Sequence, residues 1–119
     1  MKLKNSSLEK AKRILSFALK KKALEPLILD LRGFSWWWDY FVIVSSSSSP
    51  QTIAIVEEVV KEAKKVGYAL HHKEEDSAKS WVLVDFYDVV LHVFSPEKRK
   101  LYNLEHLWEK AKKLKIEKL

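Results

Sequence analysis

The chain contains no cysteine among its 119 residues, and it has only two glycines and three prolines. The absence of cysteine excludes disulfide bonds, thiol catalysis and cysteine-based zinc sites. No apolar run approaches the roughly 20 residues that a helix needs to cross a bilayer, and residues 1–7 lack the apolar segment of a signal peptide. We therefore expect a cytoplasmic protein without a membrane partner.

Hydrophobic residues make up 47% of the chain and include five tryptophans, five phenylalanines and four tyrosines. A chain of this length and composition can bury a core of its own but is too short for two ordinary domains. We expect residues 1–119 to form a single domain.

The net charge of +6 is distributed unevenly. Residues 1–23 carry eight basic and one acidic side chain, and residues 97–119 carry eight and four, whereas residues 24–96 carry six basic and eleven acidic side chains. Basic ends favour a polyanion such as RNA, and an acidic middle suits a basic protein, so a ribonucleoprotein would satisfy both. The alternative is that the lysine-rich segments only keep the protein soluble.

Apolar residues recur at helical spacing and predict a helix over residues 8–22, with Ser7 as its N-cap. Ser49 and Pro50 predict the start of a second helix, which should end before Gly67. Ser95 predicts a third helix start, and Asn103 a cap before residues 104–108. The lysine-rich remainder is expected to be helical at first and frayed at its end.

Strands are predicted over residues 26–30 and 40–44, and the second is apolar on both faces, which is typical of a central strand. Residues 68–72 predict a short strand, and residues 73–79 a charged loop. Residues 81–85 and 89–94 predict a hairpin. The fold class is therefore α/β, a single domain with a mixed β-sheet flanked by helices.

Five segments, in order and spacing, resemble the Iojap or ribosomal silencing factor family over about residues 8–110, leaving a lysine-rich tail at 111–119. These segments are Asp30-Leu-Arg-Gly33, Asp39-Tyr-Phe-Val-Ile43, Trp81-Val-Leu-Val-Asp85, Asp88-Val-Val-Leu-His-Val-Phe94 and Leu104-Glu-His-Leu-Trp108.

The resemblance implies a nucleotidyltransferase-like topology without catalytic machinery, cofactor or metal. It also implies docking on ribosomal protein L-fourteen of the large ribosomal subunit, which would sterically block association with the small subunit and repress translation.

The chain departs from the family pattern at a few positions. The family usually has Ser-Gly where this chain has Ser45-Ser46, Arg where Pro50 stands, and Gly at the hairpin turn where Tyr87 stands. Residues 36–38 are also richer in tryptophan than the family pattern. Because a tyrosine is strained at positive φ, we expect the hairpin turn to be built differently.

A two-residue hairpin loop at Phe86-Tyr87 would place Asp85 opposite Asp88, with Leu83 opposite Val90 and Trp81 opposite His92 on the same face. Such a group could form a metal or acid–base site, or it could be structural, with His92 hydrogen-bonded beneath Trp81. We favour a partner-binding surface with Trp81 as its main anchor, and at least one of the three tryptophans at 36–38 exposed beside it. The predicted contact residues are Trp81, Leu83, Asp85, Asp88, Val90, His92 and Trp37.

Other polar groups have simpler interpretations. Residues 45–49 are serines that suggest a phosphate loop, but no Asp-x-Asp pair follows, so capping is the favoured role. His71 and His72 are adjacent and would point to opposite faces of a strand, which argues against a shared metal. Lysine-rich clusters at 20–22, 98–100 and 110–118 are candidates for ribosomal RNA phosphates or simply solvated faces.

Two other functions remain open: a nucleotidyltransferase-like enzyme, and a general RNA-binding protein. The apolar hairpin surface also makes a homodimer a candidate assembly.

Overall fold

The computed structural model describes residues 3–107 and 112–114. Its elements are, in chain order, α1 (Leu3–Leu19), β1 (Leu24–Asp30), β2 (Tyr40–Ser45), α2 (Ser49–Lys65), β3 (His72–Glu75), β4 (Trp81–Asp85), β5 (Val89–Phe94), α3 (Pro96–Tyr102), α4 (Leu104–Leu107) and β6 (Lys112–Leu114). The strands form one six-stranded sheet in the order β3-β4-β5-β2-β1-β6. All described strand pairs are antiparallel except β2 with β5, so the predicted mixed α/β sheet is confirmed.

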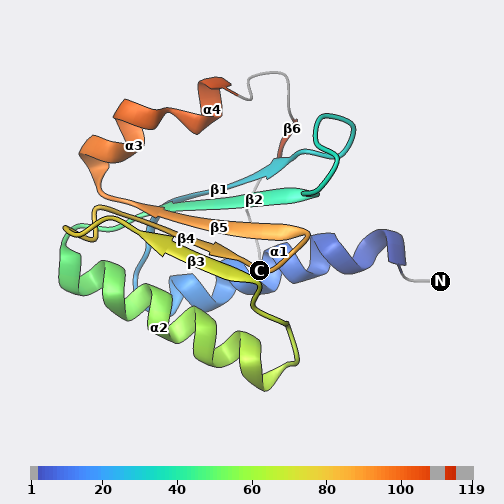
Figure 1. Ribbon diagram of the computed structural model, residues 1–119, viewed down its shortest axis with the longest axis horizontal. Helices are drawn as coiled ribbons and strands as arrows, with labels where there is room; N and C mark the ends of the chain where they lie inside the picture. The colour runs from blue at the N-terminus through green and yellow to red at the C-terminus, as the bar shows by residue number, and fades with distance from the viewer. Residues whose placement is uncertain (1–2, 108–111, 115–119) are drawn as a thin grey trace.

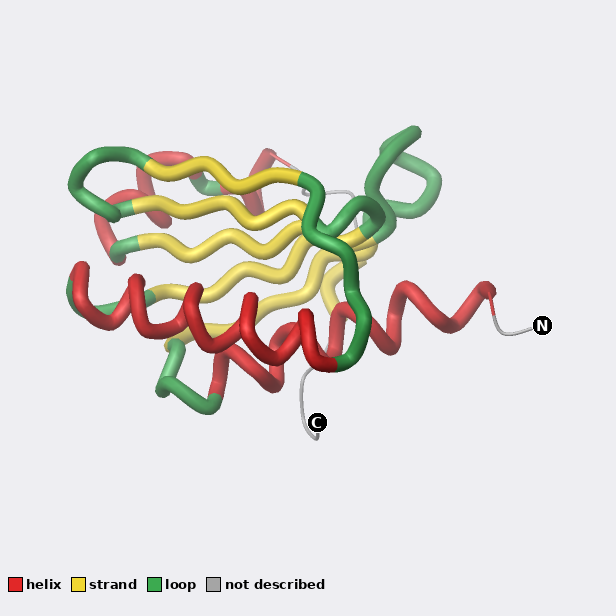
Figure 2. Tube along the Cα trace, turned by 60° about the horizontal axis from the view of Figure 1, so that its bottom comes forward, coloured by secondary structure: helices red, strands yellow, loops and turns green. Residues whose placement is uncertain are grey.

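Helices cover both faces of the sheet. Figure 1 shows α1 and α2 on one side and α3 with α4 on the other, and Figure 2 shows α2 running along the length of the strands. A large cluster of buried apolar residues lies on the α1–α2 side. A smaller cluster lies on the opposite face; it consists of Leu29, Leu31, Phe41, Ile43, Val90 and Phe94, with Trp38, Trp81, Leu83, Leu27 and Leu104 partly buried against it.

The two parallel strands β2 and β5 form the centre of the sheet. Every residue of both strands is buried, because each strand has neighbours on both edges and helices over both faces. This confirms the central position predicted for residues 40–44. Strand β4 differs, since its residues alternate between partly exposed and buried.

The boundaries of α2 and α3 follow the predicted capping residues closely. Helix α2 has its N-cap at Ser48, one residue earlier than predicted, with Pro50 in its first turn. Gly67 has a φ of 88° just beyond the helix, the left-handed conformation that favours glycine there. Ser95 caps α3 as predicted, and its hydroxyl accepts a hydrogen bond from the Lys98 N–H at 3.2 Å.

The predicted start of the first helix was wrong. Helix α1 begins at Leu3, and Ser7 lies inside it, buried, four residues before the core residue Ala11. Ser7 therefore faces the sheet as part of the helix instead of capping it. The helix also ends earlier, at Leu19, and Lys22 adopts a φ of 63° in the turn that follows.

The sequence-based prediction misplaced one strand, β3, and missed another, β6. Strand β3 covers His72–Glu75, not 68–72, and all four side chains are exposed at the sheet edge, so no apolar alternation marks it. Charged side chains are a common protection for such an edge. Lys112–Leu114 pairs with β1 as strand β6, which corrects the helical expectation there, whereas 111 and 115–119 lie outside the described residues.

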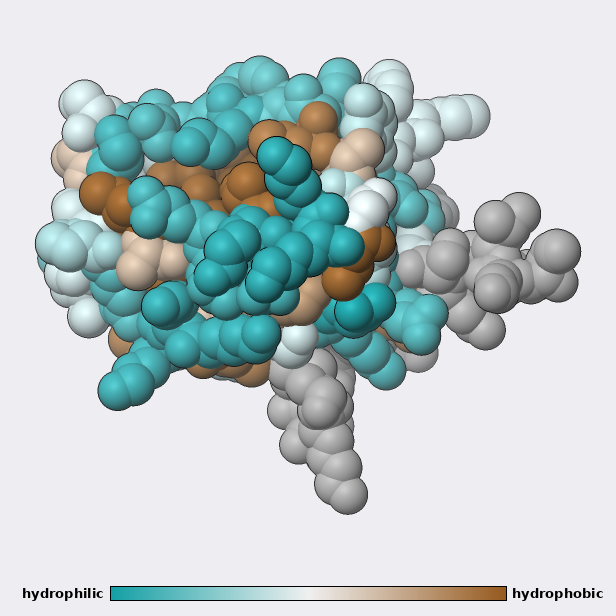
Figure 3. Space-filling view, turned by 90° about the horizontal axis from the view of Figure 1, so that it is seen from below, coloured by the Kyte–Doolittle hydropathy of each residue, from teal (hydrophilic) through white to brown (hydrophobic). Residues whose placement is uncertain are grey.

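The α1–α2 face presents mainly polar side chains. Figure 3 shows it as largely hydrophilic, with hydrophobic residues visible between the polar rows. Among the described residues, no helix combines the length and the apolar character that crossing a membrane would require.

Candidate partner-binding surface

Three predicted contact residues, Trp81, Leu83 and Asp85, lie on the same outer face of β4. They are partly exposed, whereas Val82 and Val84 between them are buried on the α1–α2 side. This alternation follows from the two-residue period of a strand. The three side chains therefore form a row about 13 Å long, at a rise of about 3.3 Å per residue.

The predicted hairpin register was wrong by two residues. Trp81 lies opposite Phe94, Leu83 opposite His92, and Asp85 opposite Val90. The two-residue loop is Tyr87-Asp88, because Phe86 pairs with Val89 through a 2.8 Å hydrogen bond from its N–H to the Val89 carbonyl. The Phe86 side chain is fully buried in the larger core, and this burial places Phe86 inside the ladder, not in the loop.

The expectation that the hairpin turn would be built without a positive φ at Tyr87 was wrong. The φ of Tyr87 is 81°, and Asp88 is not among the positive-φ residues, which matches a type II′ turn with its glycine position occupied by tyrosine. Two contacts hold Tyr87 there. The Asp85 Oδ1 accepts a 2.7 Å hydrogen bond from the Tyr87 N–H, and the tyrosine ring lies against His71 with ring centroids 4.6 Å apart.

Asp88 does not face Asp85, so the predicted carboxylate pair does not form. Instead, its Oδ1 accepts a hydrogen bond from the Lys10 Nζ at 2.7 Å, and the same ammonium group donates to the Phe86 carbonyl at 2.7 Å. The backbone carbonyl of Asp88 accepts a 2.7 Å hydrogen bond from the Asp39 N–H. Asp88 thus joins α1, the hairpin turn and the loop before β2.

His92 and Val90 lie beneath the surface, and neither is exposed to a partner in this structure. Val90 is 1% exposed and His92 5%. The Trp81 Nε1 donates to the His92 Nδ1 at 3.3 Å, which agrees with the structural alternative for this pair. Because Nδ1 accepts, the neutral ring carries its proton on Nε2, and that atom has no hydrogen-bond partner among the described residues.

The aromatic surroundings keep His92 neutral. Its ring centroid lies 4.6 Å from that of Phe41 in an edge-on arrangement, and its ring is stacked on Phe94 at 5.8 Å. Burial in this apolar cluster lowers the pKa of His92 to about 3, because taking the ring out of solvent disfavours its charged form. His92 therefore supports Trp81 from below as an uncharged hydrogen-bond acceptor.

The three tryptophans before β2 divide between surface and core. Trp36 is 93% exposed and Trp37 75%, whereas Trp38 is partly buried with its ring 5.5 Å from Phe41. The Ser35 hydroxyl accepts hydrogen bonds from the N–H groups of Trp37 and Trp38, which fixes the turn. The expectation of at least one exposed tryptophan is confirmed.

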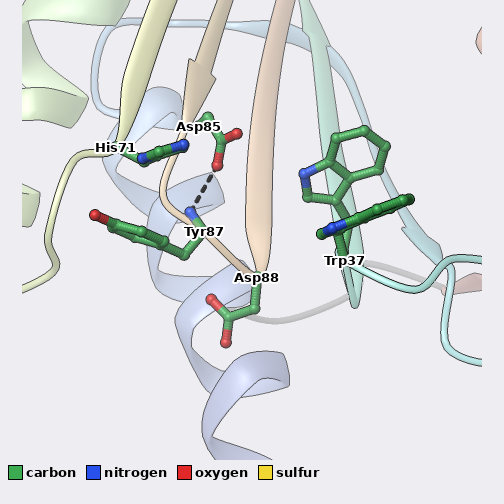
Figure 4. A pocket seen from close by; sticks show the side chains of 6 residues that line it. Trp37, His71, Asp85, Tyr87 and Asp88 are labelled. Carbon is green, nitrogen blue, oxygen red and sulfur yellow. Dashed lines mark hydrogen bonds between the residues drawn. The ribbon is translucent and has the colours of Figure 1, made fainter.

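A pocket of about 600 Å³ lies at the turn end of β4, and its walls come from three separate segments. Figure 4 shows Trp37 on one side, His71 and Tyr87 on the other, and the two carboxylates between them. The lining residues are Trp37, Trp38, His71, Asp85, Tyr87 and Asp88. The sequence analysis did not recognise that His71, Trp38 and Tyr87 belong to one site. The available signal was Tyr87, which stands at a turn position where the resemblance led us to expect glycine.

The serine loop is used for capping, as predicted. The Ser48 hydroxyl accepts a hydrogen bond from the Gln51 N–H at 3.2 Å, and the buried hydroxyls of Ser46 and Thr52 are in contact. The Ser45 hydroxyl accepts a hydrogen bond from the Arg99 Nη1 at 2.9 Å. Within the described part of the chain, no three His, Asp or Glu side chains are grouped so as to hold a metal ion.

A family model described as "Ribosomal silencing factor during starvation" matches residues 4–119, nearly the whole chain. The chain belongs to the ribosomal silencing factor family. It is 42% identical over 91 residues to the ribosomal silencing factor of Bacillus subtilis, covering 76% of this chain and 77% of that protein. It is 38% identical over 97 residues to that of Halalkalibacterium halodurans, covering 82% and 83%.

The fold agrees with this assignment. A crystal structure of a Chromobacterium violaceum protein superposes with a TM-score of 0.79 at 27% identity, covering 85% of each chain. Family membership supports a ribosome-associated role in silencing translation, which is regulatory and not enzymatic in kind.

Two residues that differ from what the sequence resemblance led us to expect lie together in space. Tyr87 stands where the sequence resemblance led us to expect glycine, and Trp37 belongs to the additional tryptophans. Both side chains line the same pocket. Both residues therefore lie at the end of the predicted binding surface.

Proposed function

We propose that the outer face of β4 binds ribosomal protein L-fourteen on the large ribosomal subunit, and that the bound protein sterically blocks the small subunit and so represses translation. The observation that carries this proposal is the row formed by Trp81, Leu83 and Asp85. It combines two partly exposed apolar side chains with a carboxylate on a rigid strand.

Trp81 is held in position before any partner arrives. Its ring packs near Phe94 and Tyr102, with centroids 6.4 and 5.9 Å away, and its Nε1 donates to His92. A side chain that is already ordered loses little conformational entropy on binding. Large aromatic side chains in such positions often dominate the binding energy of an interface.

Asp76 fixes the strand end from which Trp81 projects. Its Oδ1 accepts hydrogen bonds from the N–H groups of Ser80 at 2.7 Å and Trp81 at 3.2 Å, and its Oδ2 accepts from the Ser80 hydroxyl. Burial alone would raise the pKa of Asp76, but the hydrogen bonds from Ser80 and Trp81 outweigh burial and lower it. The carboxylate form thus stabilises the turn before β4.

Asp85 supplies the charge of the row. No lysine or arginine in the described part of the chain forms an ion pair with it. Such a carboxylate at the border of an apolar contact suits a basic ribosomal protein, because complementary charges steer association and fix orientation.

Ribosomal RNA contacts are a further part of the proposal. Lys21 and Lys22 are exposed in the turn after α1, where they could reach phosphates. Arg99 is already occupied, donating from Nη1 to the Glu25 carbonyl at 2.5 Å as well as to Ser45. The side chains of residues 110–118 lie outside the described part of the structure. Cytoplasmic location and homodimer formation stay predictions.

Titration of the protein with purified L-fourteen by calorimetry tests the proposal. We expect Trp81→Ala to weaken binding about 30-fold, the loss of about 2 kcal/mol that is typical of an anchor residue. Asp85→Asn should weaken binding about tenfold while its side-chain oxygen can still accept the Tyr87 N–H. Ile53→Ser is the matched control, since Ile53 is a 41% exposed apolar residue on α2, on the opposite side of the sheet.

Wild-type affinity in both β4 variants would contradict the proposed surface. An absence of binding by the unmodified protein would contradict L-fourteen as the partner. Tight binding to naked RNA with a steep salt dependence would instead favour the general RNA-binding alternative.

A further inference from the structure

We propose that the pocket between Trp37 and Tyr87 binds a single arginine side chain of the protein partner, with Asp85 as its counter-charge. The inference rests on the proposed function, because Asp85 belongs both to the pocket and to the β4 surface. It goes beyond that function by naming the chemical group that the pocket accepts.

The walls of the pocket are aromatic on two sides. On one side the rings of Trp37 and Trp38 are tilted by 52° with centroids 6.4 Å apart. On the other side His71 and Tyr87 are in contact, with centroids 4.6 Å apart. Figure 4 shows Asp85 and Asp88 between these walls. A cation that enters between aromatic faces is attracted by the negative faces of the rings.

The charge of the pocket matches a single cation. Asp88 is already paired with Lys10 at 2.7 Å, so its charge is balanced within the protein. Asp85 accepts only the N–H of Tyr87 through Oδ1, and its Oδ2 has no hydrogen-bond partner among the described residues. One carboxylate oxygen thus remains for a ligand that carries one positive charge.

Arginine fits these walls better than lysine does. The guanidinium group is planar, is weakly hydrated and stacks on aromatic rings while it donates to a carboxylate, whereas an ammonium group is compact and strongly hydrated. A volume of about 600 Å³ exceeds that of one side chain, so the flanking backbone of a protein partner also has room.

Tyr87 is kept at a backbone conformation that glycine would adopt without strain. Its φ of 81° is unfavourable for a side-chain-bearing residue, yet this position directs the ring against His71 and forms one wall. Trp37 forms part of the facing wall. Its side chain is 75% exposed, so little of the protein packs against it. An arginine between the two would bury both rings.

Titration with a small arginine probe tests the pocket directly. The ¹⁵N-labelled full-length protein would be titrated with N-acetyl-arginine methylamide, and the indole N–H resonances of Trp37 and Trp38 would be followed. We expect a saturable shift in the millimolar range and no saturable shift with the neutral citrulline analogue. Asp85→Asn should abolish the response to the arginine probe. An equal response to citrulline, an unchanged response in Asp85→Asn, or no saturable response would overturn the proposal.

A second experiment separates this inference from the proposed function. The double variant Trp37→Ser with Tyr87→Gly removes one ring from each wall of the pocket, and Trp81→Ala removes the anchor of the β4 surface. Binding of each variant to purified large subunits would be measured. We expect the pocket variant to bind about tenfold more weakly than the wild type, with the Tm confirming that it is folded.

The outcomes distinguish the two claims. If Trp81→Ala loses binding while the pocket variant keeps wild-type affinity, the arginine site is refuted and the proposed function stands. If the pocket variant loses binding while Trp81→Ala keeps wild-type affinity, the arginine site stands and the proposed Trp81 anchor of the β4 surface fails. If both variants bind the large subunit like the wild type, both claims are refuted.

Discussion

Acidification should destabilise this protein through His92, because the folded state cannot easily accept a proton there. The His92→Phe substitution tests the effect, since phenylalanine preserves a ring that can stack on Phe94 while it removes the titrating group. It also removes the buried Nε2 that has no partner among the described residues. The variant also loses the acceptor for the Trp81 Nε1, so we expect its stability near neutral pH to be close to that of the wild type.

The magnitude follows from the two pKa values of the histidine. Its pKa is about 6.5 when unfolded, and burial lowers the pKa of His92 to about 3 in the folded protein. The folded pKa is depressed below the unfolded one, so stability is complete above the unfolded value and is lost as the pH falls toward the folded value. At about pH 5 the unfolded histidine is protonated roughly 30 to 1, which corresponds to a loss of about 2 kcal/mol.

The assay is urea denaturation of the wild type and the variant at about pH 7.5 and about pH 5. The wild type should lose about 2 kcal/mol more free energy of unfolding than His92→Phe between these conditions. His72→Gln is the control, because it alters an exposed histidine at the sheet edge and leaves His92 in place. Equal pH dependence of the wild type and His92→Phe would refute the assignment of a neutral buried histidine.

Three further substitutions test other parts of the structure. Tyr87→Gly should raise the free energy of unfolding by about 0.5–1 kcal/mol, because glycine adopts a positive φ without strain; a lower Tm would show that the ring contact with His71 outweighs the strain. Lys10→Met should lower the free energy of unfolding by about 1–2 kcal/mol, because Asp88 and the Phe86 carbonyl lose their charged donor. Denaturant unfolding curves measure this loss, and Lys12→Met, at an exposed position on the same helix, should change the free energy of unfolding little. Asp76→Asn should lower the Tm at neutral pH and weaken the dependence of the Tm on pH in the acid range. The folded pKa of Asp76 is lowered, so its contribution to stability is present above the unfolded pKa near 4 and is lost as the pH falls through the folded value. Thermal melts in which the variant shows the same acid dependence as the wild type would contradict this.

The elements that sequence predicted well are those with strong local signals. The apolar run of residues 40–44 identified β2 as a central strand, since residues buried on both faces show no alternation. The central position of β5 was not predicted, because residues 89–94 were interpreted only as one strand of a hairpin. Pro50, Ser95 and Gly67 marked helix ends because their own backbone preferences determine those positions.

The failures occurred where tertiary packing decides between local alternatives. The hairpin register depended on whether Phe86 would be buried. The local sequence around a phenylalanine beside a turn does not indicate whether its side chain points to the core or to solvent. Strand β3 consists of exposed charged residues, so only its pairing with β4 makes it a strand.

The pocket could not be predicted because its walls are distant in sequence. Trp37, His71 and Tyr87 belong to three loops that only the sheet order brings together. Each residue had a structural interpretation when considered alone. The row Trp81, Leu83 and Asp85 was predictable, because its spacing within one strand requires a shared face.

Sucrose-gradient sedimentation of purified large and small ribosomal subunits, with and without this protein, tests the central claim most directly. Our account predicts that the protein co-sediments with the large subunit and reduces the peak of joined subunits, and that Trp81→Ala restores this peak while Ile53→Ser does not. If the protein stays at the top of the gradient and the joined peak is unchanged, the proposal that it blocks subunit association is contradicted.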